Sequence, residues 1–464
     1  MTKASSTNIS RRAFLGTALA GACAPLTVAR PARAQSSELL ASLRSTLDIT
    51  TYGVRPGALD NQSVRFQEAV NAAARQGNAL FVPGGDYMVS NIDLPSNLTM
   101  VGVPGQTRIR YAGDGHLFFG TAVNHLRLEG ITLDGANRPL ADYAPALLHV
   151  STGANIALEN VTVVGSVKHG IQFDRVQGSI DRCTVTGVLA AAIQSHDAQG
   201  LAIRDNVVSD CADNGILVYR WNKGRDGTIV TGNRIERIRS KSGGTGPFGN
   251  AINAYQADDV LIANNMIYDN DFSAVRCNGC SNAQILGNQC GESGEAAIWS
   301  EFDFRGSIVA NNVMDGCASG IVVTNFMQGG RLAIVQGNLI RNMRMQSKFP
   351  TGEEAYGSGI YVEADTTVTG NVIENAPYAG LRVGWGPYLR NVIISQNIIR
   401  KAQIGMRVSV VEGVEMTVIK DNIFDETPGG AIVGTRWWET VTSDLIDERR
   451  LPTPLTIEGN QVLS

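Results

Sequence analysis

Histidine and closely paired cysteine are scarce in this sequence, which limits the metal chemistry available to its side chains. The 464 residues include 5 His and 7 Cys. Cys277 and Cys280 form the one close pair, and neither a second pair nor a histidine stands beside them. A structural zinc site needs four ligands of these types. The sequence therefore does not predict a zinc centre, and it contains no recognisable cofactor motif.

The thiols of this pair and of Cys290 are predicted to be buried. An oxidising compartment would allow a disulfide between Cys277 and Cys280. Cys277 and Cys290 fall, however, at positions where the strand pattern points inward. We therefore expect thiols that pack as small hydrophobic side chains.

Long hydrophobic runs are also missing. The apolar stretch at residues 13–28 is shorter than the about 20 residues of a membrane span and contains two Gly and one Pro. It follows Ser10-Arg11-Arg12 and precedes the small-x-small sequence Ala32-Arg33-Ala34. These features resemble a twin-arginine export signal. The resemblance implies that residues 1–34 are removed, that the twin-arginine export machinery is a partner, and that the mature chain is periplasmic or secreted without a membrane span.

Positive charge is low once this signal is removed. Residues 1–34 contain five Lys and Arg and no acid, so the formal net charge changes from -4 to -9. A net negative protein is repelled by the phosphate backbone. We therefore expect no nucleic-acid partner.

Two cues recur eleven times, commonly at a spacing of 23 to 27 residues. The first is an Asn at the end of a short strand: Asn160, Asn206, Asn233, Asn265, Asn288, Asn312, Asn338, Asn371, Asn397, Asn422 and Asn460. The second is a small residue followed by a larger apolar one: Gly170-Ile171, Ala192-Ile193, Gly215-Ile216, Ala251-Ile252, Ala274-Val275, Ala297-Ile298, Gly320-Ile321, Gly359-Ile360, Gly380-Leu381, Gly405-Met406 and Ala431-Ile432. A period in this range predicts a solenoid of stacked units rather than several globular domains.

The segments between these cues read as strands and turns. Alternating runs such as Val260–Ala263 and Val392–Ser395 are separated by Gly, Asn and Asp. A dozen rungs at about 4.8 Å each would be roughly 55 to 60 Å long. Asn tolerates a left-handed turn, and identical amides can form a hydrogen-bonded ladder along a stack. We therefore assign the Asn residues a structural role.

One amphipathic helix is predicted before the strands, at residues 63–76. Asp60 or Asn61 is available to cap its start, and Gly77 would end it. The expected organisation is a signal at 1–34, a lead-in and capping helix at 35–97, and the repeat at 98–464. One face of the helix carries the apolar residues Phe66, Ala69, Val70, Ala73 and Ala74.

The region around this helix resembles the opening of pectate-lyase-like β-helix proteins and phage tailspikes. The resemblance lies in Tyr52–Gly57, the helix, and Phe81–Val89. From Ser10 to its end the chain is similar to twin-arginine-translocated repetitive β-helix proteins, whose rung pattern is similar to that of alginate C5-epimerases. The resemblance implies an all-β, right-handed parallel β-helix of the pectin-lyase type, with about a dozen rungs and the helix plugging the first.

The outward face of the small-Ile strands is the predicted site. Because each Ile points inward, the first and third residues after it point outward. From Asn253 to Glu363 these residues mix aromatics, amides, acids and Arg, a combination suited to sugar rings. Insertions at 241–248 and 344–354 are expected to wall this face. The candidate substrate-binding residues are Tyr219, Asn253, Tyr255, Asn278, Trp299, Arg305, Tyr361 and Arg382.

Three functions fit a polysaccharide partner on this face. Elimination or C5 epimerisation of a uronate needs a cation and a base. The candidate cations are Arg276, Arg305 and Arg220, and the candidate bases are His196, Tyr255 and Lys241. Hydrolysis needs two carboxylates, and Glu301 would lie about 9 to 10 Å from Glu363 and nearer to Asp303. A noncatalytic scaffold would use the same charges at its rim. The candidate catalytic residues are Arg276, Glu301, Asp303, Glu363 and His196.

Three smaller expectations concern the run 191–197, the paired Trp residues and the polar turns. The run 191–197 resembles the catalytic stretch of alginate C5-epimerases but keeps only His196 of its reactive groups, and we interpret this side chain as an exposed strand-end residue. Trp437 and Trp438 could cap the last rung or form a contact surface, and we favour the cap. Asp and Asn on the turns offer oxygen ligands, so calcium is an open candidate and no other cofactor is named.

Overall fold

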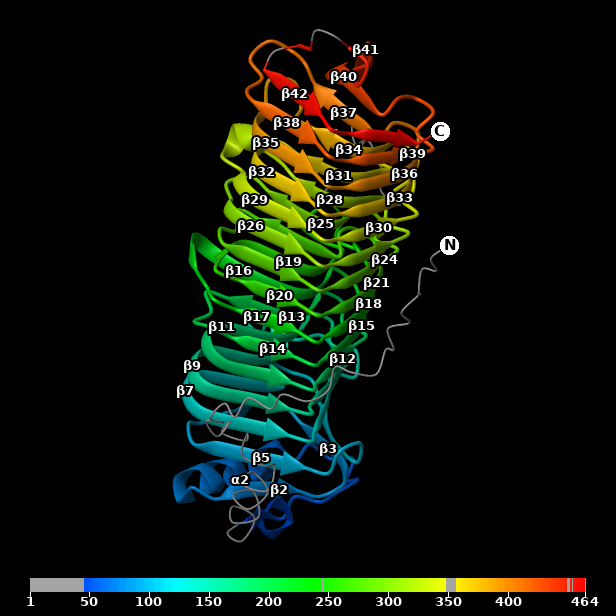
Figure 1. The fold of residues 1–464 in the computed structure, drawn as a ribbon. Helices are drawn as coiled ribbons and strands as arrows, with labels where there is room; N and C mark the ends of the chain where they lie inside the picture. The colour runs from blue at the N-terminus through cyan, green and yellow to red at the C-terminus, as the bar shows by residue number, and fades with distance from the viewer. Residues whose placement is uncertain (1–45, 244–245, 348–355, 449–450, 453, 464) are drawn as a thin grey trace, which may run out of the picture. The chain divides into compact units, whose positions relative to one another are not determined.

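The computed structural model describes residues 46–464 except 244–245, 348–355, 449–450, 453 and 464. This part of the chain is a right-handed parallel β-helix, in which each strand pairs with the equivalent strand of the next turn (Figure 1). The predicted fold class is confirmed. The expected signal at 1–34 lies outside the described residues. Over the described ranges, no helix is both long and apolar enough to cross a membrane.

A full turn contributes one strand to each of three columns. The first column, which carries the small-Ile cue, comprises β13 (Ala191–His196), β16 (Asn214–Arg225), β19 (Asn250–Asp258), β22 (Val275–Asn278), β25 (Ala296–Glu301), β28 (Ser319–Val323), β31 (Ser358–Val362), β34 (Ala379–Val383), β37 (Met406–Ser409) and β40 (Ile432–Arg436). The second comprises β14 (Ala202–Arg204), β17 (Ile229–Thr231), β20 (Leu261–Ala263), β23 (Ala283–Leu286), β26 (Arg305–Ala310), β29 (Arg331–Gln336), β32 (Ala364–Thr369), β35 (Arg390–Ser395), β38 (Thr417–Lys420) and β42 (Leu455–Glu458).

The third column forms a sheet of its own. It comprises β3 (Gly85–Val89), β6 (Thr107–Tyr111), β8 (Thr132–Asp134), β10 (Thr162–Val164), β12 (Thr184–Thr186), β15 (Val207–Cys211), β18 (Arg234–Ile238), β21 (Met266–Asn270), β24 (Gln289–Gly291), β27 (Val313–Asp315), β30 (Leu339–Arg341), β33 (Val372–Ala376), β36 (Ile398–Ala402), β39 (Ile423–Asp425) and β43 (Gln461–Leu463).

The other elements lie toward the two ends or over the first column. Long strands bridge the first and second columns in the early turns: β7 (Phe118–Glu129), β9 (Ala146–Glu159) and β11 (His169–Asp181). The remaining elements are β1 (Leu47–Asp48), the 3₁₀ helix η1 (Ile49–Tyr52), α2 (Ser63–Gln76), β2 (Ala79–Val82), β4 (Ile92–Asp93), β5 (Leu98–Gly102), the 3₁₀ helix η2 (Phe326–Gln328) and β41 (Glu439–Asp444), which pairs antiparallel with β40.

The inward half of the small-Ile cue builds the core. Ile193, Ile252 and Ile298 are fully buried. Register pairs Ile193 with Ile216 and Ile216 with Ile252, so equivalent side chains stack along the coil. Each such burial stabilises the fold by roughly 1.5–3 kcal/mol. The inward orientation predicted for this column is therefore present, and it sets the outward positions as well.

The predicted asparagine ladder runs without interruption through ten rungs. From Asn206 to Asn422, the Nδ2 of each ladder Asn donates to the Oδ1 of the Asn on the next rung at 2.9–3.0 Å. The same Oδ1 also accepts the backbone N–H of the donating Asn at 2.8–3.0 Å. Asn160 is not a member, because Cys183 occupies the position one rung below Asn206 and donates its N–H to Asn206 Oδ1. The members are Asn206, Asn233, Asn265, Asn288, Asn312, Asn338, Asn371, Asn397, Asn422 and Asn460.

The left-handed turn lies one residue earlier than predicted. Positive φ occurs at Gly287 (63°), Asn311 (59°) and Gly337 (64°), each directly before a ladder Asn. The expectation that the ladder Asn itself adopts this conformation is wrong. Gly or Asn at the preceding residue turns the chain at little steric cost. The next side chain then lies buried within the coil, where its amide can meet the amides above and below.

Helix α2 matches the predicted residues 63–76 and closes the first turns. Phe66 is fully buried, with its ring 6.5 Å from Tyr87 and 6.4 Å from Phe118, centroid to centroid. Asn61 Oδ1 accepts the N–H of Ser63 at 2.9 Å, while Gly77 ends the helix at φ 67°. The helix contacts β2 and β5 and so covers apolar side chains of the early turns.

The six cysteines of the described chain are buried and unbridged. Cys277 and Cys290 pack in the core as predicted. Burial raises the pKa of Cys183 and of Cys211 to about 12. A thiol with such a pKa stays protonated at neutral pH and is a poor nucleophile.

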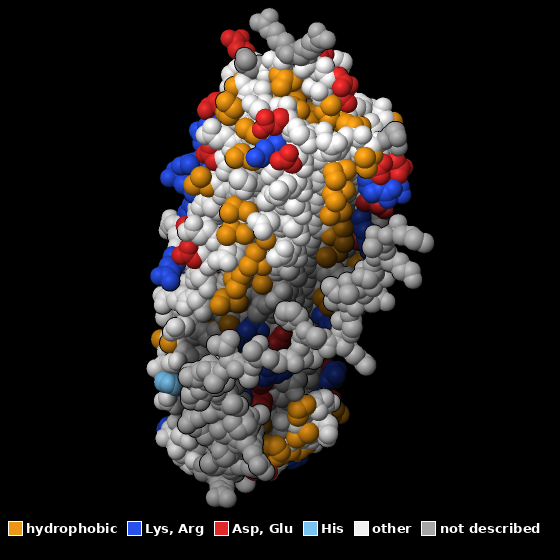
Figure 2. Space-filling view, viewed as in Figure 1, with side chains coloured by type: hydrophobic (Ala, Val, Ile, Leu, Met, Phe, Trp, Pro, Cys, Tyr) orange, Lys and Arg blue, Asp and Glu red, His pale blue; other side chains and the backbone are white. Residues whose placement is uncertain are grey.

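The outer sides of the second and third columns carry apolar side chains in rows. Figure 2 shows two rows of hydrophobic side chains along the stack. β-Branched side chains fit an exposed, pleated strand surface. These rows lack the aromatic and charged mixture of the first column. Their exposed members include Ile229, Ile308, Ile334 and Ile393 on the second column, and Met266, Leu339, Val372 and Ile398 on the third.

Removing an amide from the middle of the ladder should destabilise the coil more than removing one from its end. Asn312→Ala would leave the Ile285 carbonyl and two donors of Asn288 without partners in a buried site. We expect a loss on the order of 3 kcal/mol, seen as a lower urea midpoint. Asn460→Ala, at the solvent-accessible last rung, should lower it less. Equal losses in the two variants would contradict the ladder's stabilising role.

Candidate functional site: an aromatic groove over the first column

A groove of about 770 Å³ lies over the outer side of the first column, between β22 and the β40–β41 hairpin. Six of the predicted site residues line it: Arg276, Trp299, Glu301, Tyr361, Glu363 and Arg382. Further lining residues were not on the predicted list: Glu295, Thr324, Asn325, Met327, Gln328, Tyr356, Trp385, Tyr388, Trp437 and Trp438. We call this site the aromatic groove.

Strand register explains why residues more than a hundred positions apart share one groove. Arg276 pairs with Trp299, and Tyr361 pairs with Arg382, each on adjacent rungs. Val322 joins the two pairs by pairing with Trp299 below and Tyr361 above. Adjacent parallel strands are about 4.8 Å apart. Five side chains therefore form one column along the groove floor.

Arg276 is the centre of a buried ion triad. Its Nε and Nη2 donate to the two carboxylate oxygens of Glu301 at 2.6 and 3.0 Å. Its Nη1 donates to Glu295 Oε2 at 3.1 Å. Asn278 Nδ2 adds a bond of 2.9 Å to Glu301 Oε1, and the guanidinium carbon lies 4.8 Å from the Trp299 ring centroid.

The hydrogen bonds within this triad leave the Glu301 carboxylate little capacity to bind or react with a ligand. The Glu301 carboxylate is 2% exposed at the side chain and already accepts three hydrogen bonds. At Gly246, in the loop before β19, a Cβ would collide with the Arg276 guanidinium, so this loop packs directly over it. The predicted insertion at 241–248 therefore does wall the face at its described residues. The second insertion, at 344–354, lies mostly outside the described residues.

Glu363 has a different environment at the middle of the groove. The residue follows β31, and its Oε1 accepts from the Tyr361 hydroxyl at 2.8 Å while Oε2 accepts from the Phe326 N–H at 2.7 Å. Burial raises the pKa of Glu363, against the opposing effect of these hydrogen bonds and of Arg382. Burial also raises the pKa of Tyr361. A carboxyl group with a raised pKa binds a proton more readily than an ordinary one, which suits a group that takes up a proton in general acid–base catalysis.

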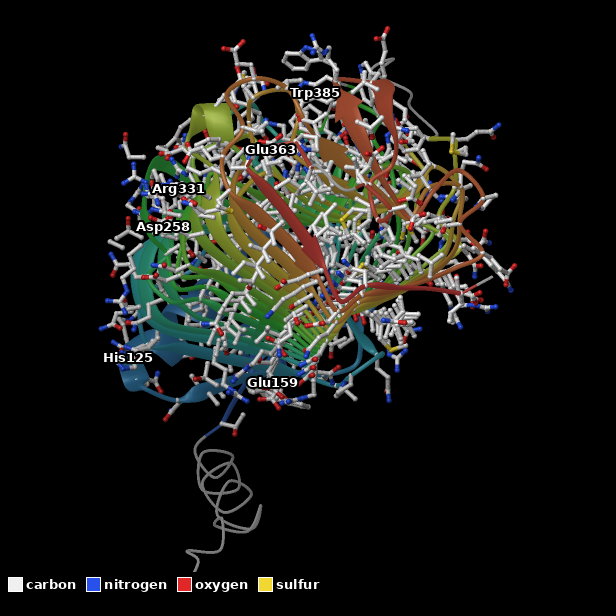
Figure 3. All side chains as sticks on the ribbon, turned by 45° about the horizontal axis from the view of Figure 1, so that its top comes forward. His125, Glu159, Asp258, Arg331, Glu363 and Trp385 are labelled. Atoms are coloured by element: carbon white, nitrogen blue, oxygen red, sulfur yellow. The ribbon has the colours of Figure 1, made fainter. Side chains whose placement is uncertain are left out.

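Three tryptophans wall the far end of the groove. The ring centroid of Trp385 lies 5.1 Å from that of Trp437 and 4.4 Å from that of Trp438. Figure 3 labels Trp385 together with Glu363, the other lining residue marked there. The expectation that Trp437 and Trp438 cap the last rung is wrong. The β40–β41 hairpin turns at these residues and places both rings beside the groove.

Several predicted residues lie outside the groove. Asp303 and Arg305 are more than half exposed at the rim, 4.0 Å apart, and Asp303 also pairs with Lys223 at 3.2 Å. Asn253 donates to the Pro247 carbonyl at 3.2 Å beneath the covering loop. Asp303 and Arg305 therefore resemble ordinary surface charges, which contribute little to stability.

His196 belongs to a separate cluster several rungs below. Asp174 accepts from His149 at 2.7 Å and from His196 at 3.0 Å. Burial opposes ionisation of Asp174, but its hydrogen bonds with both imidazoles and with Gln172 hold its pKa below the ordinary value. His196 ends β13, as the interpretation as a strand-end residue predicted, but the expected exposure is wrong, since its side chain is 16% exposed and paired with Asp174.

Aromatic rings continue from this cluster toward the groove. Tyr219 stacks on Tyr255 with centroids 5.1 Å apart and an interplanar angle of 12°, and its ring lies 5.0 Å from that of His196. Sequence reasoning missed His149 because its rung carries Leu147-Leu148 in place of the small-Ile cue. His149 is the first residue after the inward Leu148, so the rule that such residues point outward could have identified it. Within the described ranges, no group of three or more His, Cys, Asp or Glu side chains is arranged to hold a metal ion.

Comparisons with known families agree on the coil. The model of the right handed β-helix region matches residues 223–389, and that of the periplasmic copper-binding protein NosD matches residues 127–298. Each match covers less than half of the chain. No curated protein sequence matches the chain significantly. The chain is thus similar to these families over its central rungs.

Solved structures share the fold at low sequence identity. The N-terminal fragment of bacteriophage phi29 gene product 12 aligns with TM-score 0.53 and 15% identity over 92% of this chain and 73% of that one. The pre-mature form of gene product 12 aligns with TM-score 0.53 and 16% identity, over 87% of this chain and 57% of that one. The A-module of Azotobacter vinelandii mannuronan C-5 epimerase AlgE6 aligns with TM-score 0.47 and 15% identity over 90% and 99%. At such identities the likeness shows the fold alone.

Removing a carboxylate from the ion triad should lower the free energy of unfolding of the coil, whether or not a ligand is bound. Glu301→Gln leaves a buried guanidinium with one carboxylate partner, and removing one member of a buried pair costs about 3–5 kcal/mol. Asp303→Asn, which removes an exposed carboxylate from the same stretch of chain, should cost less than about 1 kcal/mol. Thermal unfolding of both variants checks this. If Glu301→Gln is as stable as Asp303→Asn, the triad does not support the groove wall.

The raised pKa of Glu363 predicts a stability that depends on pH. In the window between the ordinary carboxyl pKa of 4.5 and the raised folded value, the folded state binds more protons than the unfolded state. The carboxyl should therefore lower the free energy of unfolding as pH rises through this window. Glu363→Gln cannot bind this proton. The melting temperature of the natural chain should therefore fall relative to that of Glu363→Gln as pH rises. A constant difference across the window would contradict the raised pKa.

Proposed function

We propose that this protein binds a polysaccharide chain along the aromatic groove and that Glu363, with Tyr361, performs proton transfer on it, as in elimination or C5 epimerisation. The observation that carries the proposal is the combination of a buried carboxyl group of raised pKa with aromatic walls in one groove. Perturbed carboxyl groups inside clefts are typical of catalytic sites.

The walls support a sugar ligand. Trp299, Trp385 and Trp438 present flat apolar rings to the groove, which suit the C–H faces of pyranose rings. Thr324 and Asn325 on the floor add hydroxyl and amide groups for sugar hydroxyls. A groove that follows the coil axis suits a chain of sugars better than a single small molecule.

The charges favour proton transfer over hydrolysis. A glycoside hydrolase needs two carboxyl groups free to face the scissile bond. Glu301 is occupied by Arg276, so Glu363 is the one carboxyl in the described groove that is not tied to a guanidinium. A single base suffices to take the proton from C5 of a uronate. Loss of the 4-oxygen then yields an unsaturated uronate, whereas reprotonation on the other face yields the epimer.

A noncatalytic polysaccharide-binding scaffold is the second candidate. The saturation of Arg276 by Glu301 and Glu295 favours it, because these charges then shape the groove without meeting a reacting sugar. In either case we place the protein in the periplasm or outside the cell after export through residues 1–34. The match to the model of periplasmic NosD proteins supports this location.

Turnover of defined polymers separates the candidates. The mature protein is incubated with uronate and neutral polysaccharides, and products are followed by the ultraviolet absorbance of unsaturated uronates, by NMR of C5 configuration, and by reducing ends. Glu363→Gln should lower turnover by about 10²- to 10⁴-fold with binding retained. Glu374→Gln, which changes a half-buried carboxyl on β33 outside the groove, is the matched control.

Two results would change the assignment. New reducing ends without unsaturation or epimerisation would favour hydrolysis. Binding of a polymer with none of these products would leave the scaffold as the function.

A further inference from the structure

Arg382 is a charged side chain in the aromatic groove with no counter-ion among the described residues. Its guanidinium carbon lies 4.1 Å from the Tyr361 ring centroid and 5.1 Å from that of Trp438. In contrast to Arg276, it forms no salt bridge with any carboxylate that the structure describes. Two aromatic contacts hold the group but leave its N–H donors without acceptors in that part of the chain.

The surroundings of Arg382 add positive charge. Arg407 pairs with it in register on the next rung and also forms no salt bridge within the described ranges. Arg407 donates to the Trp438 carbonyl at 2.6 Å and lies over the Tyr378 ring at 5.0 Å. Burial and, to a smaller extent, the Arg407 charge lower the pKa of Arg382, while nearby Tyr361 opposes this.

Among the described residues, no carboxylate forms an ion pair with the Arg382 guanidinium. Glu363 is the acid whose charge acts on Arg382, but it already accepts from Tyr361 and Phe326 and forms no salt bridge with Arg382. A partly buried cation without a partner is costly. An anion that enters the groove would remove this cost and gain bidentate hydrogen bonds, because the guanidinium fork matches a planar carboxylate or a sulfate edge.

We propose that Arg382 is an anion subsite of the aromatic groove and binds the carboxylate or sulfate ester of an acidic polysaccharide. Trp438 and Trp385 then flank the sugar ring that bears this group. The proposal rests on the proposed function of the groove, and it adds the residue that recognises the acidic group and widens that group from a uronate carboxylate to a sulfate ester.

The test compares three oligosaccharides of equal length by calorimetry: a uronic acid hexasaccharide, its carboxyl-reduced counterpart, and a sulfated neutral hexasaccharide. The natural protein should bind one of the anionic forms at least about tenfold more tightly than the reduced form. Arg382→Gln should remove this preference. Arg341→Gln, on β30 of the third column, should keep it. Preference for carboxylate or for sulfate identifies which group the site takes.

The remaining outcomes decide against either the Arg382 subsite or the proposed function. An unchanged preference in Arg382→Gln overturns the proposal. If Arg382→Gln does not fold, Arg382→Lys decides, because loss of the planar fork should reduce the preference at least about threefold, and an unchanged value overturns the proposal. If no hexasaccharide binds, the proposed function fails. Inorganic sulfate then tests the subsite alone: it should raise the melting temperature of the natural protein and not of Arg382→Gln, and equal effects in both overturn it.

Discussion

The parallel pairing of each turn with the next is the constraint on which the rest of the structure depends. Pairing at a fixed spacing places every residue directly over its equivalent, inside and outside the coil. Inside, this allows ten Asn side chains to share one continuous ladder. Outside, it allows residues such as Arg276 and Trp299 to become neighbours although they are far apart in sequence. The core and the groove are two consequences of one register.

Stacking also decides the electrostatics of the groove. Arg276 lies one rung from Glu301 and is neutralised by it, so the charges at that end form part of the wall. Arg382 lies next to Arg407 and meets no described acid, so the charge at the other end is left for a ligand. Glu363 lies between them, buried and bonded to Tyr361. A cation left for a ligand and a carboxyl of raised pKa are thus adjacent, which is the arrangement that proton abstraction next to an acidic group requires.

The fold was predictable because its causes are local and repeated. The Ile of each small-Ile pair and the ladder Asn show a period that any one copy would not reveal, and the amphipathic helix at 63–76 has its own apolar face and terminal glycine. The position of the left-handed turn was misplaced by one residue because Asn and Gly both favour it. Asn160 looked like a ladder residue because it closes a strand, yet Cys183 is the equivalent of Asn206.

By itself the sequence determined the coil, its inward residues and the side of the coil that carries the unusual side chains, because strand periodicity alone sets which residues face outward. Only the tertiary structure decided which of those residues are free. Register placed Glu301 one rung from Arg276, which forms an ion pair with it, the hairpin after β40 brought Trp437 and Trp438 over the groove, and the bond between Asp174 and His196 removed a candidate base from the exposed surface. Pairing between distant rungs depends on loop lengths and on which side chains meet across the stack, and these are not properties of any single repeat.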